Sequence, residues 1–189
     1  HQDTMSLVVL DQTPAATATQ VVATLTDETQ HRIISTGMAV ASQDHWQLDY
    51  RLTNHHDQAT WTTIASQLRV PTGLRVQHVQ LLMDGKTTTL NPQIIQKQHL
   101  PVTLQHALGP GSTGTTIRLK GQAVTVPTTQ SVAAVTSRFT SNLGVTLAKT
   151  PAFRLTAKPT LQLTVTSAQR VKLATQQATT VEGRITDRD

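Results

Sequence analysis

The stretch of residues 45–53 constrains the fold more than any other part of this sequence, because apolar and polar residues alternate along it without a break. Its apolar members are Trp46, Leu48, Tyr50 and Leu52. Successive side chains of an extended strand point to opposite faces, so these four share one face. We therefore expect a β-strand that packs one face against a core and turns the other toward solvent.

The composition extends this expectation to the whole chain. Of the 189 residues, 35 are Thr and only 2 are Glu, a balance that favours strands over helices. Only 3% of the residues are aromatic, so the core has to be built mainly from Val, Leu, Ile and Ala. The sequence predicts an all-β protein.

Other stretches of strand length follow the same pattern and are separated by turn residues. They cover residues 20–26, 32–40, 59–70, 74–83, 100–104, 115–126, 131–140 and 145–147. Asp84-Gly85 stands between two of them and predicts a tight hairpin turn with positive φ. We expect the turn Asp27-Glu28-Thr29-Gln30 to join the first pair, and Pro71-Thr72-Gly73 to open another strand.

Residues 1–157 are expected to form one β-sandwich, with a boundary close to Pro159. Residues 158–189 are too few for a second sandwich. Two alternatives stay open for them: extra strands of the preceding sheet, or the first strands of a following immunoglobulin-like repeat.

Ordered short motifs across residues 40–140 resemble the conserved-repeat, immunoglobulin-like domains of bacterial extracellular proteins. The motifs are Trp46 to Asn54, Ala59 to Val70, Pro71 to Leu74, the Gly-rich loop 108–113 followed by Thr116-Ile117, and the Ala/Val/Thr strand 132–137. At Leu68-Arg69-Val70 this chain departs from the family, which usually has an Asp-containing strand there.

The resemblance implies an immunoglobulin-like antiparallel β-sandwich of a Gram-positive cell-surface protein, located extracellularly at the surface or in the cell wall. It implies a non-enzymatic structural or adhesive module, either a spacer or a domain in contact with the cell wall or the host. Residues 180–187 are similar to the second strand of another such repeat, which implies a tandem array. The alternative function is a carbohydrate-binding β-sandwich module.

Trp61 is the candidate ligand contact for that alternative. It is flanked by Thr60, Thr62 and Thr63, and an exposed Trp on a sheet stacks on sugar rings. Trp46 and Tyr50 are instead expected in the core.

No catalytic residue, cofactor or metal site is predicted. The chain has no Cys for a disulfide or a thiolate ligand. His55-His56-Asp57 reads as a polar connection rather than a metal site, because adjacent side chains of an extended segment point apart. The loop 109–114 lacks the Lys of a phosphate-binding loop, and no Gly-x-Ser-x-Gly motif occurs.

The net charge of +5 and the pI near 10.1 allow a polyanionic partner. The basic residues are spread singly and aromatic residues are few, which argues against nucleic acid. We expect cell-wall polymers, host glycans or proteins, and adjacent domains of the same chain as partners. No apolar run reaches the length of a membrane span.

Some surface domains of this general kind carry an internal isopeptide bond between Lys and Asn or Asp. It needs a buried Lys beside a buried amide and a carboxylate. The candidate residues are Lys97, Lys120 and Lys149 with Asn54, Asn91 and Asn142.

Overall fold

The computed structural model describes residues 18–90, 98–158, 160–165 and 183–188, and these ranges contain strands and turns without a helix. The strands are β1 (Thr19–Asp27), β2 (Arg32–Ile33), β3 (Ala39–Ala41), β4 (His45–Asn54), β5 (Ile64–Arg69), β6 (Leu74–Met83), β7 (Lys86–Leu90), β8 (His99–Leu104), β9 (Thr115–Ala123), β10 (Gln130–Val132), β11 (Thr136–Ser141), β12 (Gly144–Lys149), β13 (Phe153–Thr156), β14 (Thr160–Val165) and β15 (Gly183–Arg188).

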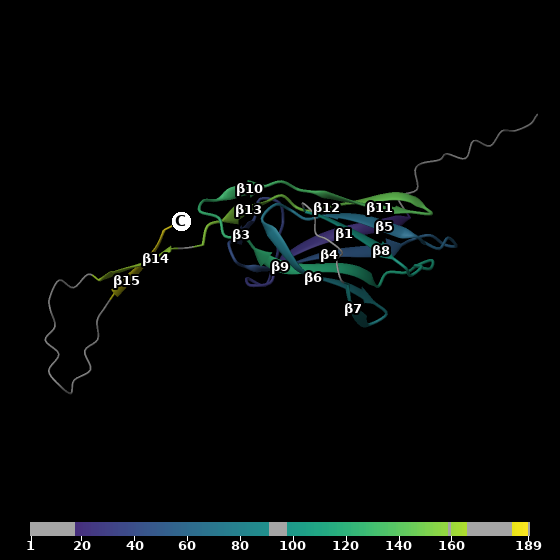
Figure 1. Ribbon diagram of the computed structural model, residues 1–189, viewed down its shortest axis with the longest axis horizontal. Coiled ribbons are helices and arrows are strands. Elements are labelled where there is room, and N and C mark those ends of the chain that lie inside the picture. The colour runs from purple at the N-terminus through teal and green to yellow at the C-terminus, as the bar shows by residue number, and fades with distance from the viewer. Residues whose placement is uncertain (1–17, 91–97, 159, 166–182, 189) are drawn as a thin grey trace, which may run out of the picture.

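Two antiparallel sheets form the body of the molecule (Figure 1). One has six strands in the order β2-β1-β4-β9-β6-β7, and the other has four in the order β12-β11-β5-β8. A small sheet, β10-β13-β3, lies at one end of the body. The architecture is an immunoglobulin-like β-sandwich, as the sequence predicted.

The alternating stretch of residues 45–53 lies in β4, the third strand of the larger sheet. It pairs with β1 over nine residues, from Thr19 opposite Asn54 to Asp27 opposite Trp46. On its other side it pairs with β9. This central position explains why every second side chain of β4 is fully buried.

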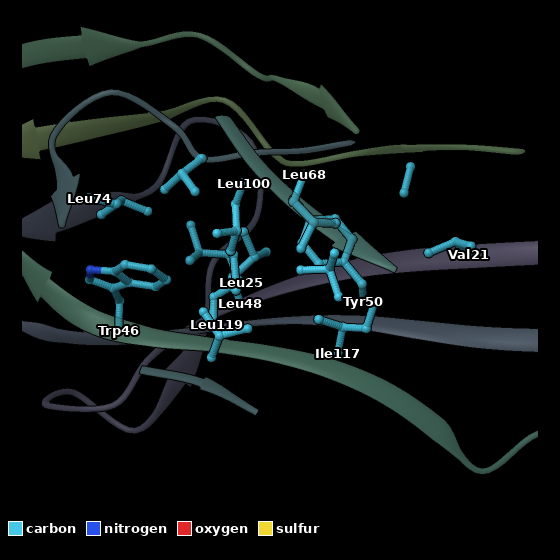
Figure 2. Packing of buried hydrophobic residues seen from close by; sticks show 14 of the residues in the cluster. Val21, Leu25, Trp46, Leu48, Tyr50, Leu68, Leu74, Leu100, Ile117 and Leu119 are labelled. Atoms are coloured by element: carbon cyan, nitrogen blue, oxygen red, sulfur yellow. The ribbon is translucent and has the colours of Figure 1, made fainter. Parts of the chain in front are cut away.

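The core fills the space between the two sheets (Figure 2). Leu48, Ile117 and Leu119 of the six-stranded sheet face Leu68 and Leu100 of the four-stranded sheet, and none of these five side chains is exposed. Trp46 and Tyr50 belong to the same cluster, so their predicted core positions are confirmed. Burial of this apolar surface is the main favourable term for folding.

The predicted turns occur where the sequence places them. Asp84 and Gly85 both have positive φ, 51° and 71°, and join β6 to β7 as a hairpin. The turn before β6 contains Gly73 with φ of 86°. Asp27 and Arg32 pair across the turn between β1 and β2.

Four predicted strands are shorter than expected. Residues 131–140 are divided into β10 and β11, and β9 ends at Ala123 instead of residue 126. Residues 32–40 are divided into β2 and β3, because the chain turns at Gly37, whose φ is 87°. Of residues 59–70, the strand β5 begins only at Ile64, after Trp61 has formed an isolated bridge to Leu108.

Strand β13 pairs with β10 and β3, so residues 153–156 belong to the small sheet at the end of the sandwich. Strands β14 and β15 pair with each other in antiparallel register. The division between residues 1–157 and 158–189 stays a prediction.

Candidate functional site

Trp61, the predicted ligand contact, lies in the core. Its exposed fraction is 0%, and its backbone exchanges two hydrogen bonds of 2.9 Å with Leu108. These two hydrogen bonds form the isolated β-bridge between Trp61 and Leu108. The indole of Trp61 packs into the hydrophobic cluster. The expectation of an exposed ring is therefore wrong, and Trp61 offers no surface for stacking on a sugar.

Every aromatic side chain of the protein shares this burial. The chain has two Trp, one Tyr and two Phe, and all five are buried: Trp46, Trp61, Tyr50, Phe139 and Phe153. Their rings pack inside the sandwich, with Tyr50 and Phe139 in a tilted pair at 5.8 Å between centroids. The molecule therefore has no aromatic platform for a sugar or a nucleobase.

Asn54 at the end of β4 organises the loops around the Trp61 bridge. It is fully buried, and its Nδ2 donates to the carbonyl oxygens of Ala59 and Leu108 at 2.9 Å. Its Oδ1 accepts a hydrogen bond from the backbone N–H of His56. The sequence analysis named Asn54 as the last residue of a family motif and as an isopeptide candidate, whereas the structure gives it a role in loop positioning.

The other isopeptide candidates in the described part of the chain are not buried together. Lys149 and Asn142 are exposed and Lys120 is half-buried. The Nδ2 of Asn142 donates to the carbonyl oxygen of Thr60 at 2.9 Å. The described residues thus provide no buried Lys beside a free amide. The candidates Lys97 and Asn91 lie outside the described residues.

The segment His55-His56-Asp57 forms a polar connection after β4. His55 is exposed, and its Nε2 lies 3.3 Å from Oε1 of Gln20. Among the residues that the structure describes, no three His, Asp or Glu side chains are grouped so as to hold a metal ion. The Gly-rich loop 109–114 is a turn, and it leads into the strand β9 rather than a helix.

Two buried carboxyl groups face each other at the β3 end of the sandwich. Asp27 ends β1 and Asp44 precedes β4, and Oδ2 of each has no hydrogen-bond partner in the described structure. Burial, together with the charge of Asp27, raises the pKa of Asp44 to about 6. Sequence analysis missed this pair, since the two residues meet only through the β1–β4 register.

The outer face of the four-stranded sheet carries three cationic side chains. Buried and exposed residues alternate along β5, β8, β11 and β12, apart from Ser141 and Gly144 at the turn between β11 and β12. Arg69, Arg138 and Lys149 belong to the exposed set. We name this surface the basic face and define it by these three residues.

Strand register gathers the basic face from residues far apart in the sequence. Arg138 lies opposite Gln67 of β5 and Leu147 of β12, while Lys149 lies opposite Thr136. Arg69 follows Gln67 by two residues on β5, and its backbone N–H donates to Ser137 Oγ at 2.9 Å. The three cations therefore occupy three adjacent strands, with neighbouring strands about 4.8 Å apart.

The fold and the basic face define an immunoglobulin-like β-sandwich with a cationic sheet surface. No protein-family model and no curated protein matches this chain. Several solved structures match this chain, and three of them follow. The first is described as BspA_C_WT, with 11% identity and a TM-score of 0.46, over 74% of this chain and 50% of that one.

The second is the C-terminal domain of the Streptococcus pyogenes antigen I/II-family protein AspA, with 13% identity and a TM-score of 0.47, over 73% of this chain and 46% of that one. The third is the N-terminal domain of PorA, with 11% identity and a TM-score of 0.31, over 70% of this chain and 96% of that one. This chain matches about half the length of each of the first two proteins. Identities this low concern the fold alone.

Proposed function

We propose that this protein is a structural spacer module of a bacterial cell-surface protein, without enzymatic activity of its own. The observation that carries the proposal is the position of the two ends of the sandwich. Thr19, which begins β1, pairs with Asn54 at one end of β4. Thr156, which ends β13, pairs with Ala41, and its carbonyl oxygen accepts from the N–H of Ser42, just before the other end of β4.

The chain thus enters the sandwich at one end and leaves it at the opposite end (Figure 1). β4 has 10 residues, and an extended strand rises about 3.3 Å per residue, so the two ends are separated by about 33 Å. A module of this kind adds its full length to a chain of domains, which is what a spacer requires.

The direction of the strands also suits a spacer under tension. Force applied at Thr19 and Thr156 acts along β1, which is hydrogen-bonded to β4 over nine residues. Such a load strains all these hydrogen bonds together, because it slides the strands past each other instead of separating them one pair at a time. The arrangement therefore resists extension.

Location at the cell surface is part of the proposal. The chain has no Cys, and its Thr-rich strands present hydroxyl groups on the exposed faces of both sheets. No helix in the described ranges is long and apolar enough to cross a membrane. The resemblance across residues 40–140 to repeats of bacterial extracellular proteins supports the same location.

The carbohydrate-binding alternative has lost its candidate residue. Its premise was an exposed Trp61, and both Trp side chains are at most 1% exposed.

Single-molecule force spectroscopy tests the spacer function. Cys introduced at the exposed Gln20 and Lys158 gives two unique attachment points, since the chain has no other Cys. We expect one cooperative unfolding step, releasing about 3.5 Å of contour per residue between the handles. Continuous extension at low force without a step would contradict a spacer that bears tension.

A further inference from the structure

The basic face is a surface of one charge sign. The strands that form it, β5, β8, β11 and β12, contain no Asp or Glu. In the sequence no acidic residue occurs between Asp84 and Glu182. The basic groups of this sheet therefore have no acidic neighbour on their own strands.

Charge is distributed differently on the opposite sheet. There, Arg118 donates two hydrogen bonds of 2.8 Å to the carboxylate of Asp49, the ion pair found among the described residues. Arg69, Arg138 and Lys149 have no such partner in the described part of the chain. Their charges are consequently available to a ligand.

Uncharged polar, aliphatic and hydroxyl-bearing side chains and one His surround the three cations. The other exposed residues of these four strands, apart from turn residues at the strand ends, are Ala65, Gln67, His99, Pro101, Thr103, Thr136, Thr140, Val145 and Leu147. The surface is thus the outer face of a four-stranded sheet with hydroxyl groups on the strands that carry the cations. Small molecules bind mostly in concave pockets, so an open sheet face suits an extended chain better.

We propose that the basic face binds a linear phosphodiester polymer of the bacterial cell wall. Guanidinium groups match the oxygens of a phosphate in a bidentate manner, and Lys adds a point charge. Cations on three adjacent strands contact successive phosphates of one extended chain. The inference rests on the proposed location at the cell surface and names the partner there.

Two features of the face favour this polymer over nucleic acid. Recognition of single strands uses aromatic side chains on which bases stack, and all aromatic residues of this protein are buried. The hydroxyl groups of Thr103, Thr136 and Thr140 are instead suited to a polyol phosphate chain, whose own hydroxyl groups accept and donate hydrogen bonds.

Binding to purified poly(glycerol phosphate) tests the proposal, measured by calorimetry or interferometry at low ionic strength. The triple substitution Arg69→Gln, Arg138→Gln and Lys149→Gln is expected to weaken binding by about tenfold or more. All three side chains are exposed, so the fold is expected to persist, which circular dichroism checks.

A matched control removes the same charge from the opposite sheet. It replaces Arg51, Arg75 and Lys86, which are exposed on β4, β6 and β7, by Gln. We expect less than about a threefold change for this variant, because screening limits the reach of distant charges. Equal losses in both variants would overturn the proposal, since net charge alone would then explain binding.

The choice of ligand is tested with polyglutamate and a single-stranded DNA of equal charge. Weaker binding of both than of poly(glycerol phosphate) is expected, and equal or tighter binding of either would overturn the phosphodiester assignment. Absence of binding to all three polymers would overturn the basic face as a site. None of these results affects the mechanical test of the spacer, so the two proposals fail independently.

Discussion

The hydroxyl of Ser137 donates a hydrogen bond of 2.9 Å to the hydroxyl oxygen of Tyr50, and this bond joins the two sheets of the sandwich. Tyr50 belongs to β4 and Ser137 to β11. The Tyr50 hydroxyl in turn donates to the carbonyl oxygen of Arg69 at 3.1 Å. A polar connection between sheets thus lies in an otherwise apolar core.

Replacing Tyr50 by Phe is expected to lower the free energy of unfolding by about 1–2 kcal/mol. The ring still fills its place beside Phe139, whereas the carbonyl oxygen of Arg69 and the hydroxyl of Ser137 each lose a partner. Urea denaturation measures the change. A double-mutant cycle with Ser137→Ala should show coupling, and additive losses would contradict a direct connection.

Alkaline pH should weaken the same connection. Burial raises the pKa of Tyr50 to about 12, from an ordinary value near 10. The folded state prefers the protonated phenol, so this contribution is complete below pH 10 and is lost as the pH rises through 12. Unfolding measured across this range should show a decline for the native protein that is smaller in Tyr50→Phe. Since Tyr50 is the only Tyr, tyrosinate absorbance reports its ionisation directly.

The raised pKa of Asp44 predicts that stability also depends on pH in the acidic range. Its pKa near 6 exceeds the ordinary 3.8, because burial and the neighbouring Asp27 disfavour a second negative charge. The stabilising contribution is therefore present below pH 3.8 and is lost as the pH rises through 6. At pH 7.5 the substitution Asp44→Asn should raise stability by about 1–2 kcal/mol.

The gain from Asp44→Asn should shrink toward zero near pH 4, where the native carboxyl is already protonated. Thermal or urea unfolding at both pH values provides the comparison. A gain of equal size at both would indicate a cause other than the charge of Asp44.

Gly121 of β9 is required by the close approach of β6. A bulge between Val76 and His78 brings the backbone so near that a Cβ at position 121 would lie 1.7 Å from the carbonyl oxygen of Arg75. Gly121→Ala should therefore cost about 3 kcal/mol or more. The control Gly114→Ala, whose Cβ meets no atom within 4 Å, should change stability by less than about 0.5 kcal/mol. Similar unfolding curves for both variants would refute the close approach.

Local patterns in the sequence predicted much of the sandwich. The alternation of β4 reports directly which face is buried, and Asp84-Gly85 specifies its turn because few other residues adopt positive φ. Each of these signals lies within a few consecutive residues. Because they are local, they could be recognised in the sequence without the tertiary structure.

The candidate site depends on contacts that local patterns do not contain. Trp61 is buried because its backbone meets Leu108, 47 residues later, and the surrounding Thr residues gave no sign of this. Arg69, Arg138 and Lys149 read as isolated charges until strand register places them on neighbouring strands. Pairing order between distant strands was the missing information.

The central claim is that the chain enters and leaves the sandwich at opposite ends. Spin labels on Cys introduced at Gln20 and Lys158 measure this distance directly by pulsed electron paramagnetic resonance. Gln20 and Thr113 serve as a control pair at one end of the sandwich, because Thr19 pairs with Asn54 and the N–H of Asn54 donates to the carbonyl oxygen of Ser112. The distance between labels on this pair should be less than about 20 Å. For Gln20 and Lys158 we predict about 30–40 Å, the length of β4 with its label linkers, and a distance as short as that of the control pair would contradict the account.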